Sequence, residues 1–102
     1  MSEATVTDNA AQKRYELREG GAIGGWLEYE DRGPVRVFTH TRVPAEHEGK
    51  GYGSRLVKAA LDDMRRRKRH IVAQCEFVDA YMRRHPEYEY LRADAGAAGG
   101  GG

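Results

Sequence analysis

A chain of 102 residues is long enough for one small domain and too short for two. Its 17 basic and 16 acidic residues leave a net charge of +1, which gives no support to nucleic-acid binding as the main function. One cysteine excludes an internal disulfide, and no run reaches the ~18 apolar residues of a membrane-spanning helix. Because the N-terminal residues also lack the apolar segment of a secretory signal, we expect a cytoplasmic protein with no membrane partner.

Both ends of the chain carry little apolar sequence. Residues 1–12 show no apolar periodicity, and the residues after 91 are mostly glycine and alanine. We therefore expect a flexible N-terminus over residues 1–12, one folded domain over 13–91 and a disordered tail over 92–102.

Three strands are predicted in the first half of the domain. Residues 13–19 and 22–31 are joined by a glycine turn, and apolar side chains alternate with polar ones in the second of these segments. Residues 35–43 alternate again, which places Phe38 and His40 on one face, and Pro44 then ends the strand because it lacks a backbone N–H. Short links between consecutive strands indicate an antiparallel meander.

The hydrophobic period changes after Pro44. Apolar residues recur at helical spacing over 51–67, which predicts a long helix with one buried face. A buried strand is indicated at 70–75, a second helix at 76–85 and a final edge strand at 87–91. The predicted fold class is α/β, with a mixed sheet of four to five strands and two main helices.

Three glycines at alternate positions, Gly49, Gly51 and Gly53, lead into the long helix. Such a loop can turn successive backbone N–H groups toward one point, where the helix N-terminus adds partial positive charge, so it suits a phosphate. The spacing differs from the dinucleotide fingerprint and from the Walker motif. From spacing alone, an ordinary glycine-rich turn remains the alternative.

The segment from Glu48 to Gly53 resembles the acyl-CoA-binding motif of the GCN5-related N-acetyltransferases, usually written Q/R-x-x-G-x-G/A. Three further strings are similar to hallmarks of the short, single-domain branch of that superfamily. They are HTRVP at 40–44, CEFV at 75–78 and HPEY at 85–88. The motifs occur in order, and the resemblance covers residues 14–91.

The resemblance implies a minimal version of that fold and transfer of an acetyl group from acetyl-CoA to an amine, on a small molecule or on a protein. It implies that coenzyme A contacts one continuous loop and the strand before it. The implied cofactor-binding residues are Val43, Glu48, Gly49, Lys50, Gly51, Tyr52, Gly53 and Ser54. Two departures from the pattern stand out. Glu48 replaces the usual glutamine or arginine, and only a glycine turn replaces two helices that longer members carry between the first two strands.

Three residues are candidates for catalysis. The resemblance implies that Cys75 lies near the thioester, as nucleophile or as pocket wall, while a small buried hydrophobe is the other interpretation. His40 could take the proton from an acceptor ammonium or be an ordinary surface or core histidine. Tyr81 could protonate the leaving thiolate or be a core aromatic residue.

Other functions are weighed against this one. A non-enzymatic acyl-CoA-binding or protein-interaction module that has lost the acceptor site is the main alternative. The basic run at 65–70 suggests nucleic-acid binding, but cations in a last helical turn also suit the helix dipole, so we do not expect that role. One cysteine and four histidines show no ligand spacing, so no metal site is predicted.

Overall fold

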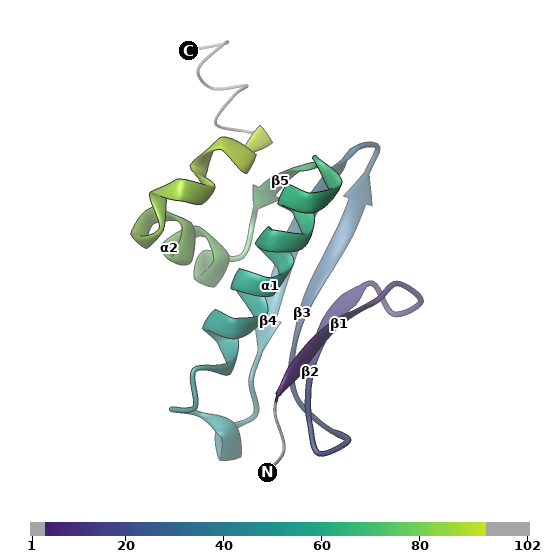
Figure 1. The fold of residues 1–102 in the computed structure, drawn as a ribbon, viewed down its shortest axis with the longest axis vertical. Helices are drawn as coiled ribbons and strands as arrows, with labels where there is room; N and C mark the ends of the chain where they lie inside the picture. Colours follow the sequence, from purple (N-terminus) through teal and green to yellow (C-terminus); the bar gives the residue numbers. More distant parts are fainter. Residues whose placement is uncertain (1–3, 94–102) are drawn as a thin grey trace.

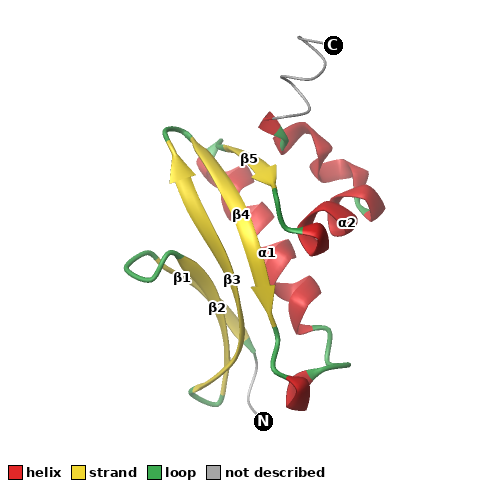
Figure 2. Cartoon of the chain, turned by 180° about the vertical axis from the view of Figure 1, so that it is seen from behind, coloured by secondary structure: helices red, strands yellow, loops and turns green. Residues whose placement is uncertain are grey.

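The computed structural model describes residues 4–93 as a five-stranded sheet with two main helices (Figure 1). The strands are β1 Thr5–Asn9, β2 Arg14–Glu19, β3 Ala22–Arg32, β4 Val35–Arg42 and β5 His70–Ala73. The helices are α1 Tyr52–Arg67 and α2 Glu76–Arg84, with short 3-10 helices η1 Ala45–His47 and η2 Pro86–Leu91. Helix α1 crosses one face of the sheet, and α2 lies beside the end of β5 (Figure 2).

The sheet combines an antiparallel meander with one parallel pair. Strands β1 to β4 pair in sequence order, each antiparallel to the next, and β5 pairs parallel to β4. Helix α1 forms the crossover that a parallel pair requires. This topology confirms the predicted α/β class with a mixed sheet of four to five strands and two main helices.

Strand β4 extends beyond its parallel partner, which leaves an opening in the sheet. The last pair joins Phe38 to Ala73, and the backbone N–H of Cys75 then donates to the carbonyl of Phe38 at 2.9 Å. Residues 39–42 continue along β3, with no strand on the β5 side among the described residues. The edge of β4 toward β5 is therefore open beyond Phe38.

Strands β2 and β3 are joined only by Gly20 and Gly21, whose φ angles are 61° and 86°. Positive φ at both central residues gives the tight hairpin turn whose twist matches that of the strands. No helix is inserted between these strands, as the sequence indicates. The face of the sheet away from α1 carries no helix in the described part of the chain (Figure 2).

The prediction of a flexible N-terminus was wrong for Thr5–Asn9, which forms β1. Val6 is the one aliphatic side chain in this strand, so apolar periodicity gives no signal there. Tertiary contacts fix the strand instead, because Asp8 accepts hydrogen bonds from the Tyr29 hydroxyl at 2.5 Å and from Arg36 at 3.3 Å. The predicted disordered tail lies, from residue 94 onward, outside the described residues.

The predicted edge strand at 87–91 was also wrong, since Pro86–Leu91 forms helix η2. Proline is favoured in a first helical turn, where its missing N–H has no intrahelical partner to lose. Tyr88 and Leu91 are both buried, and their three-residue spacing puts them on one side of a 3-10 helix. The aromatic and apolar residues of this segment therefore follow a period of three rather than two.

A bulge in β4 reverses the faces that simple alternation predicts. Glu28 of β3 lies opposite His40, while the next residue, Tyr29, lies opposite Phe38, so Thr39 has no partner. A β-bulge of this kind shifts the side-chain alternation by one residue. His40 therefore lies on the face away from α1, and the expectation that it shares a face with Phe38 was wrong.

The core lies between the sheet and α1, and aromatic side chains form its strand side. The ring centroids of Tyr15, Tyr29 and Phe38 lie 5.5–6.4 Å apart in tilted and edge-on arrangements. Helix α1 contributes one apolar stripe, as its sequence predicts. Its fully buried apolar residues are Leu56, Val57, Ala60, Leu61 and Met64.

Arg36 brings a charge into this core. Its side chain is 4% exposed, and its Nε and Nη2 donate to the two carboxylate oxygens of Asp31 at 2.8 and 3.1 Å. Its Nη1 donates to Asp8 at 3.3 Å, and its guanidinium carbon lies 3.8 Å from the ring centroid of Tyr29. The hydrogen bonds from Arg36 lower the pKa of Asp31, so this carboxylate stays ionised beside the guanidinium.

Tyr15 extends the same network to α1. Nη1 of Arg36 donates to the Tyr15 hydroxyl at 2.9 Å, and that hydroxyl donates to Asp63 at 2.6 Å. Burial, and then the hydrogen bond to Asp63, raise the pKa of Tyr15, so its hydroxyl keeps its proton. One arginine thus connects β1, β3 and β4 directly, and it reaches β2 and α1 through one tyrosine.

We expect Arg36→Met to reduce the free energy of unfolding by about 1–3 kcal/mol, because it removes the buried donor to Asp8, Asp31 and Tyr15, while Arg67 and Arg69 still pair with the two carboxylates. Urea denaturation of the purified protein measures this change. Arg32→Met is the matched control, since Arg32 and Glu30 form an exposed pair at 3.6 Å that is worth at most about 1 kcal/mol. Equal losses in the two variants would contradict the prediction.

Tyr52, the first residue of α1, packs against the sheet at the other end of the core. It is 4% exposed, and its hydroxyl donates to Glu19 at the end of β2. A Cβ placed on Gly24 of β3 would lie 2.7 Å from Cε2 of Tyr52 and 3.3 Å from Leu17. The tyrosine ring therefore occupies the space that a side chain at position 24 would need.

We expect Gly24→Ala to destabilise the protein by about 1–3 kcal/mol through overpacking against this ring. The loss should shrink in a Tyr52→Ala background and persist in a Tyr52→Phe background, which keeps the ring and removes only the hydroxyl. Urea denaturation of the double-mutant cycle measures the coupling. The same cost of Gly24→Ala in all three backgrounds would show that the two residues do not compete for space.

Candidate functional site

The glycine loop ends at an uncapped helix N-terminus. Gly49 and Gly51 have φ angles of 87° and 74°, a left-handed conformation that favours glycine, and a Cβ on either would meet nothing within 4 Å. Gly51 is the N-cap of α1, and no side chain caps the helix. The first helical hydrogen bond joins the N–H of Arg55 to the carbonyl of Gly51 at 3.1 Å. The N–H groups of residues 52–54 therefore have no partner within the helix.

The charges around this N-terminus favour an anion. The first turn of α1 contains no acidic residue, and the helix dipole adds partial positive charge there. Glu48, which departs from the family motif, is exposed, and its side chain does not cap the helix. Its carboxylate is therefore free to stay in solvent instead of facing the N–H groups.

A groove of about 460 Å³ opens beside the loop, and we call it the glycine-loop groove. It is lined by the end of β4, by the loop, by the first turn of α1 and by one side chain of α2. Every residue predicted to bind the cofactor lines it except Lys50, whose ammonium lies 5.7 Å from the Tyr52 ring. The lining residues are Thr41, Val43, His47, Glu48, Gly49, Gly51, Tyr52, Gly53, Ser54 and Phe77.

Sequence reasoning did not assign Thr41, His47 and Phe77 to this groove. Phe77 belongs to the CEFV motif, and a Cβ on Gly53 would lie 2.7 Å from its ring, so the glycine admits the aromatic side chain to the helix start. His47 stacks near Tyr52 with ring centroids 5.5 Å apart. The CEFV motif contains Phe77, but the packing of its ring against Gly53 was needed to show that it faces the loop.

His47 lines the groove and contains a buried polar atom without a partner. Its Nδ1 has no hydrogen-bond partner in the described residues. A buried polar atom without a partner costs about 1–3 kcal/mol. Because this nitrogen is buried, a ligand in the groove reaches it only if the imidazole turns.

Cys75 lies where β4 and β5 separate. Its Sγ is 3.2 Å from Oγ1 of Thr41, which lines the groove, and its side chain is only partly buried. The backbone N–H of Cys75 is tied to β4 through Phe38, and α2 begins at the next residue. The structure thus places the thiol next to the end of the groove, with a hydroxyl as its neighbour.

His40 lies on the opposite side of β4 from Thr41, as adjacent strand residues do, and the bulge at Thr39 puts it on the face away from α1. Its side chain is 70% exposed, and its Nδ1 is 3.7 Å from Oε1 of Glu28. His40 therefore does not line the glycine-loop groove, and its role as a base stays a prediction.

Tyr81 does not reach the groove. It is 5% exposed, and its ring stacks on His85 with centroids 4.1 Å apart and lies 6.2 Å from Tyr88. Burial raises the pKa of Tyr81, as expected for a tyrosine in a core. The structure therefore favours the core interpretation of this residue.

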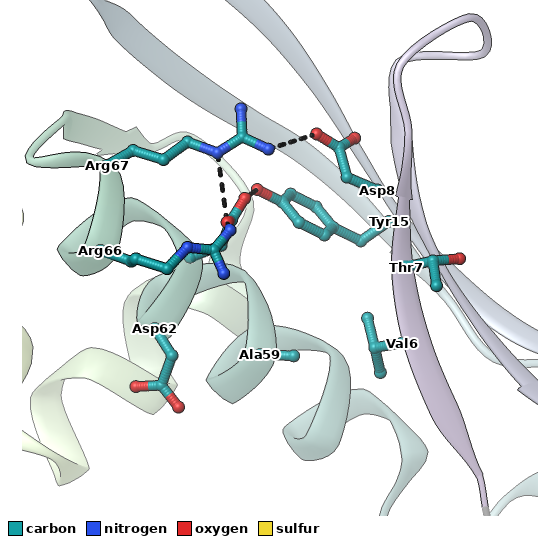
Figure 3. Close-up of a pocket in the computed structure, with 9 residues that line it drawn as sticks. Val6, Thr7, Asp8, Tyr15, Ala59, Asp62, Arg66 and Arg67 are labelled. Carbon is teal, nitrogen blue, oxygen red and sulfur yellow. Dashed lines mark hydrogen bonds and ion pairs between the residues drawn. The ribbon is translucent and has the colours of Figure 1, made fainter.

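A larger hollow of about 580 Å³ lies between β1 and α1, but its polar groups bind one another (Figure 3). Asp63 accepts hydrogen bonds from Tyr15 and from Arg66 and Arg67. Arg67 also donates to Asp8 at 3.5 Å. With these charges already paired, this hollow offers a ligand less than the glycine-loop groove does.

Intramolecular contacts also occupy the basic run. Arg65 donates to the hydroxyl of Tyr90 at 3.0 Å, and Arg69 donates to Asp31 at 3.0 Å and to the carbonyl of Pro34 at 3.1 Å.

Within residues 4–93, no group of three metal-ligating side chains comes together. No helix in the same range combines the length and apolar character needed to cross a membrane.

Comparison with known proteins agrees with this geometry. The chain's fold is similar to the NMR solution structure of a GCN5-like protein from Staphylococcus aureus, with a TM-score of 0.68 and 20% identity. The match covers 90% of each chain. Among curated proteins, no significant match to the chain is found. Residues 14–91 match the sequence profile described as GCN5-related N-acetyl-transferase, and the chain belongs to this family.

Proposed function

We propose that this protein is an acetyltransferase that holds acetyl-CoA in the glycine-loop groove and acetylates a primary amine. The observation that carries the proposal is the uncapped start of α1, which follows two glycines of positive φ and opens onto the groove. Three free N–H groups and a helix dipole form a ready site for a pyrophosphate. The imidazole of His47 lines the groove at the same place.

The remaining parts of the site suit the other parts of coenzyme A. The open edge of β4 beyond Phe38 offers backbone groups, as far as Val43, to the amides of an extended pantetheine arm. Phe77 and Val43 add apolar surface along the groove. Lys50 belongs to the loop but does not line the groove, and its charge would attract phosphate through solvent.

Acetyl transfer needs an amine without its extra proton. A neutral imidazole is suited to accept that proton. Nδ1 of His40 lies 3.7 Å from Oε1 of Glu28, so this carboxylate would stabilise the imidazolium. The amine nitrogen then bonds to the acetyl carbon while the carbon–sulfur bond breaks, and coenzyme A leaves as the thiol with the second amine proton. Cys75 and Thr41 form the wall at which this exchange takes place.

We expect Gly51→Val to weaken coenzyme A binding at least tenfold, because a branched side chain at φ 74° distorts the start of α1 and covers its N–H groups. Isothermal titration calorimetry with coenzyme A measures the affinity. Gly33→Val is the matched control, since Gly33 has φ 60° and an equally open Cβ position but lies in the β3–β4 turn. A folded Gly51→Val protein that binds as tightly as the Gly33→Val protein would overturn the assignment of the groove.

We expect direct attack by the amine, with Cys75 as pocket wall, so Cys75→Ala should lower kcat/KM by about tenfold at most and leave coenzyme A binding in place. The structure gives this thiol a hydroxyl neighbour, Thr41, and no base. Intact-mass analysis after incubation with acetyl-CoA, followed by addition of amine, tests the route. A stable acetyl adduct on Cys75 that an amine discharges at the catalytic rate would establish a covalent mechanism instead.

The second candidate function is a non-enzymatic binding module, because only a glycine turn joins β2 and β3. Coenzyme A binding without turnover on any amine would favour this module.

A further inference from the structure

The first residue of α1 has contacts in two directions, one toward the groove and one toward the sheet. Tyr52 lines the glycine-loop groove, yet its ring is buried and its hydroxyl donates to the carboxylate of Glu19 at the end of β2. In residues 4–93 this hydroxyl is the one side-chain donor that reaches that carboxylate. The packed ring and the bonded hydroxyl therefore fix the whole side chain.

A β-bulge at Gly24 makes the space that the ring occupies. The register of β2 with β3 shifts between Leu17 and Arg18, and Gly24 is left without a partner. A Cβ on Gly24 would lie 2.7 Å from Cε2 and 3.0 Å from Cδ2 of Tyr52. The position of the ring is therefore set by the β2–β3 hairpin as well as by the helix.

The glycine loop itself has only local hydrogen bonds among the described residues. The N–H of Glu48 donates to Ala45 at 3.1 Å, and the N–H of Lys50 donates to His47 at 3.3 Å. The loop also packs on Tyr52, since the His47 and Tyr52 ring centroids lie 5.5 Å apart and the Lys50 ammonium lies 5.7 Å from the Tyr52 ring. One aromatic ring thus connects the loop to the hairpin.

The same residue also belongs to the anion site. As the first residue of α1, Tyr52 carries one of the backbone N–H groups that have no partner within the helix. The side chain that Glu19 fixes and a backbone group that would bind phosphate are therefore parts of one residue. A shift of the ring would move this N–H group with it.

We propose that Tyr52, held by Glu19, is a positioning residue that keeps the glycine loop in the conformation that binds the pyrophosphate of coenzyme A. This inference rests on the proposed acetyl-CoA site. Glycines at positive φ allow a loop many backbone conformations, and ordering such a loop during binding costs affinity. Contacts that order it beforehand remove that cost, because the apparent dissociation constant rises as the competent fraction of the protein falls.

The first test is ¹⁵N NMR relaxation of the full chain without coenzyme A. Tyr52→Phe keeps the ring and removes the hydroxyl, so we expect the amide signals of Gly49 and Gly51 to broaden through exchange on the μs–ms timescale. Tyr29→Phe is the matched control, because the Tyr29 hydroxyl also donates to a carboxylate, that of Asp8, but between β3 and β1. Its glycine signals should keep the wild-type line widths. Equal line widths in the two variants would overturn the positioning role.

The second test is isothermal titration calorimetry with coenzyme A. We expect Tyr52→Phe and Glu19→Ala each to bind about fivefold more weakly, as when about a fifth of the molecules hold the loop in the binding conformation. Glu19→Gln removes the charge and keeps an acceptor, so its affinity should stay within about twofold of the wild type, as should that of Tyr29→Phe. The double variant Glu19→Ala/Tyr52→Phe should bind no more weakly than either single variant, because both changes remove the same hydrogen bond.

Unchanged affinity in Tyr52→Phe, or equal losses in Tyr52→Phe and Tyr29→Phe, would contradict the proposal, since a general loss of stability affects both variants. A loss in Glu19→Gln as large as in Glu19→Ala would show that the charge of Glu19 acts instead of its hydrogen bond, which also overturns it. A wild-type protein that does not bind coenzyme A contradicts the proposed acetyl-CoA site alone. The relaxation data without ligand then decide by themselves whether Tyr52 orders the loop.

Discussion

The buried guanidinium of Arg36 is the interaction on which the arrangement of this small sheet depends. A small domain buries a smaller share of its surface than a large one, so directional polar contacts matter more in positioning its strands. Arg36 provides such bonds to β1 and β3 and, through Tyr15, to α1. Asp8 ties the edge strand β1 to this set of bonds, in addition to the pairing of β1 with β2.

The bulge at Thr39 decides which face of the sheet each side chain at the end of β4 meets. Before the bulge, β4 directs Phe38 into the core, and after it the same strand directs Thr41 toward the glycine-loop groove and His40 toward the outer face of the sheet. The early end of β5 then opens the sheet at this level. One extra residue in β4 and the early end of β5 therefore bring the groove and the outer face of the sheet to a common opening.

The sequence was sufficient to predict the elements that have a strong local period, and these include the whole crossover from β4 through α1 to β5. It also predicted the loop of the glycine-loop groove, since positive φ at Gly49 and Gly51 is what that motif of glycines favours. It could not show the bulge at Thr39, because nothing in the residue types of β4 marks which residue loses its partner. It assigned Tyr81 to catalysis on resemblance alone, whereas stacking on His85 depends on how α2 meets η2. Partners distant in sequence decided each of these cases.

The two-glycine link between β2 and β3 affects how the proposed reaction would compete with water. Because no helix covers the outer face of these strands in the described part of the chain, an acceptor bound there would keep much of its surface in solvent. In the proposed reaction an acetyl thioester at the opening would also lie close to bulk water, so hydrolysis would be a side reaction whose rate sets a lower limit on useful acceptor concentration. Product release, in contrast, would need no movement of a covering helix. A minimal transferase of this kind would exchange substrates rapidly and owe its selectivity to the few charges at its entrance rather than to enclosure.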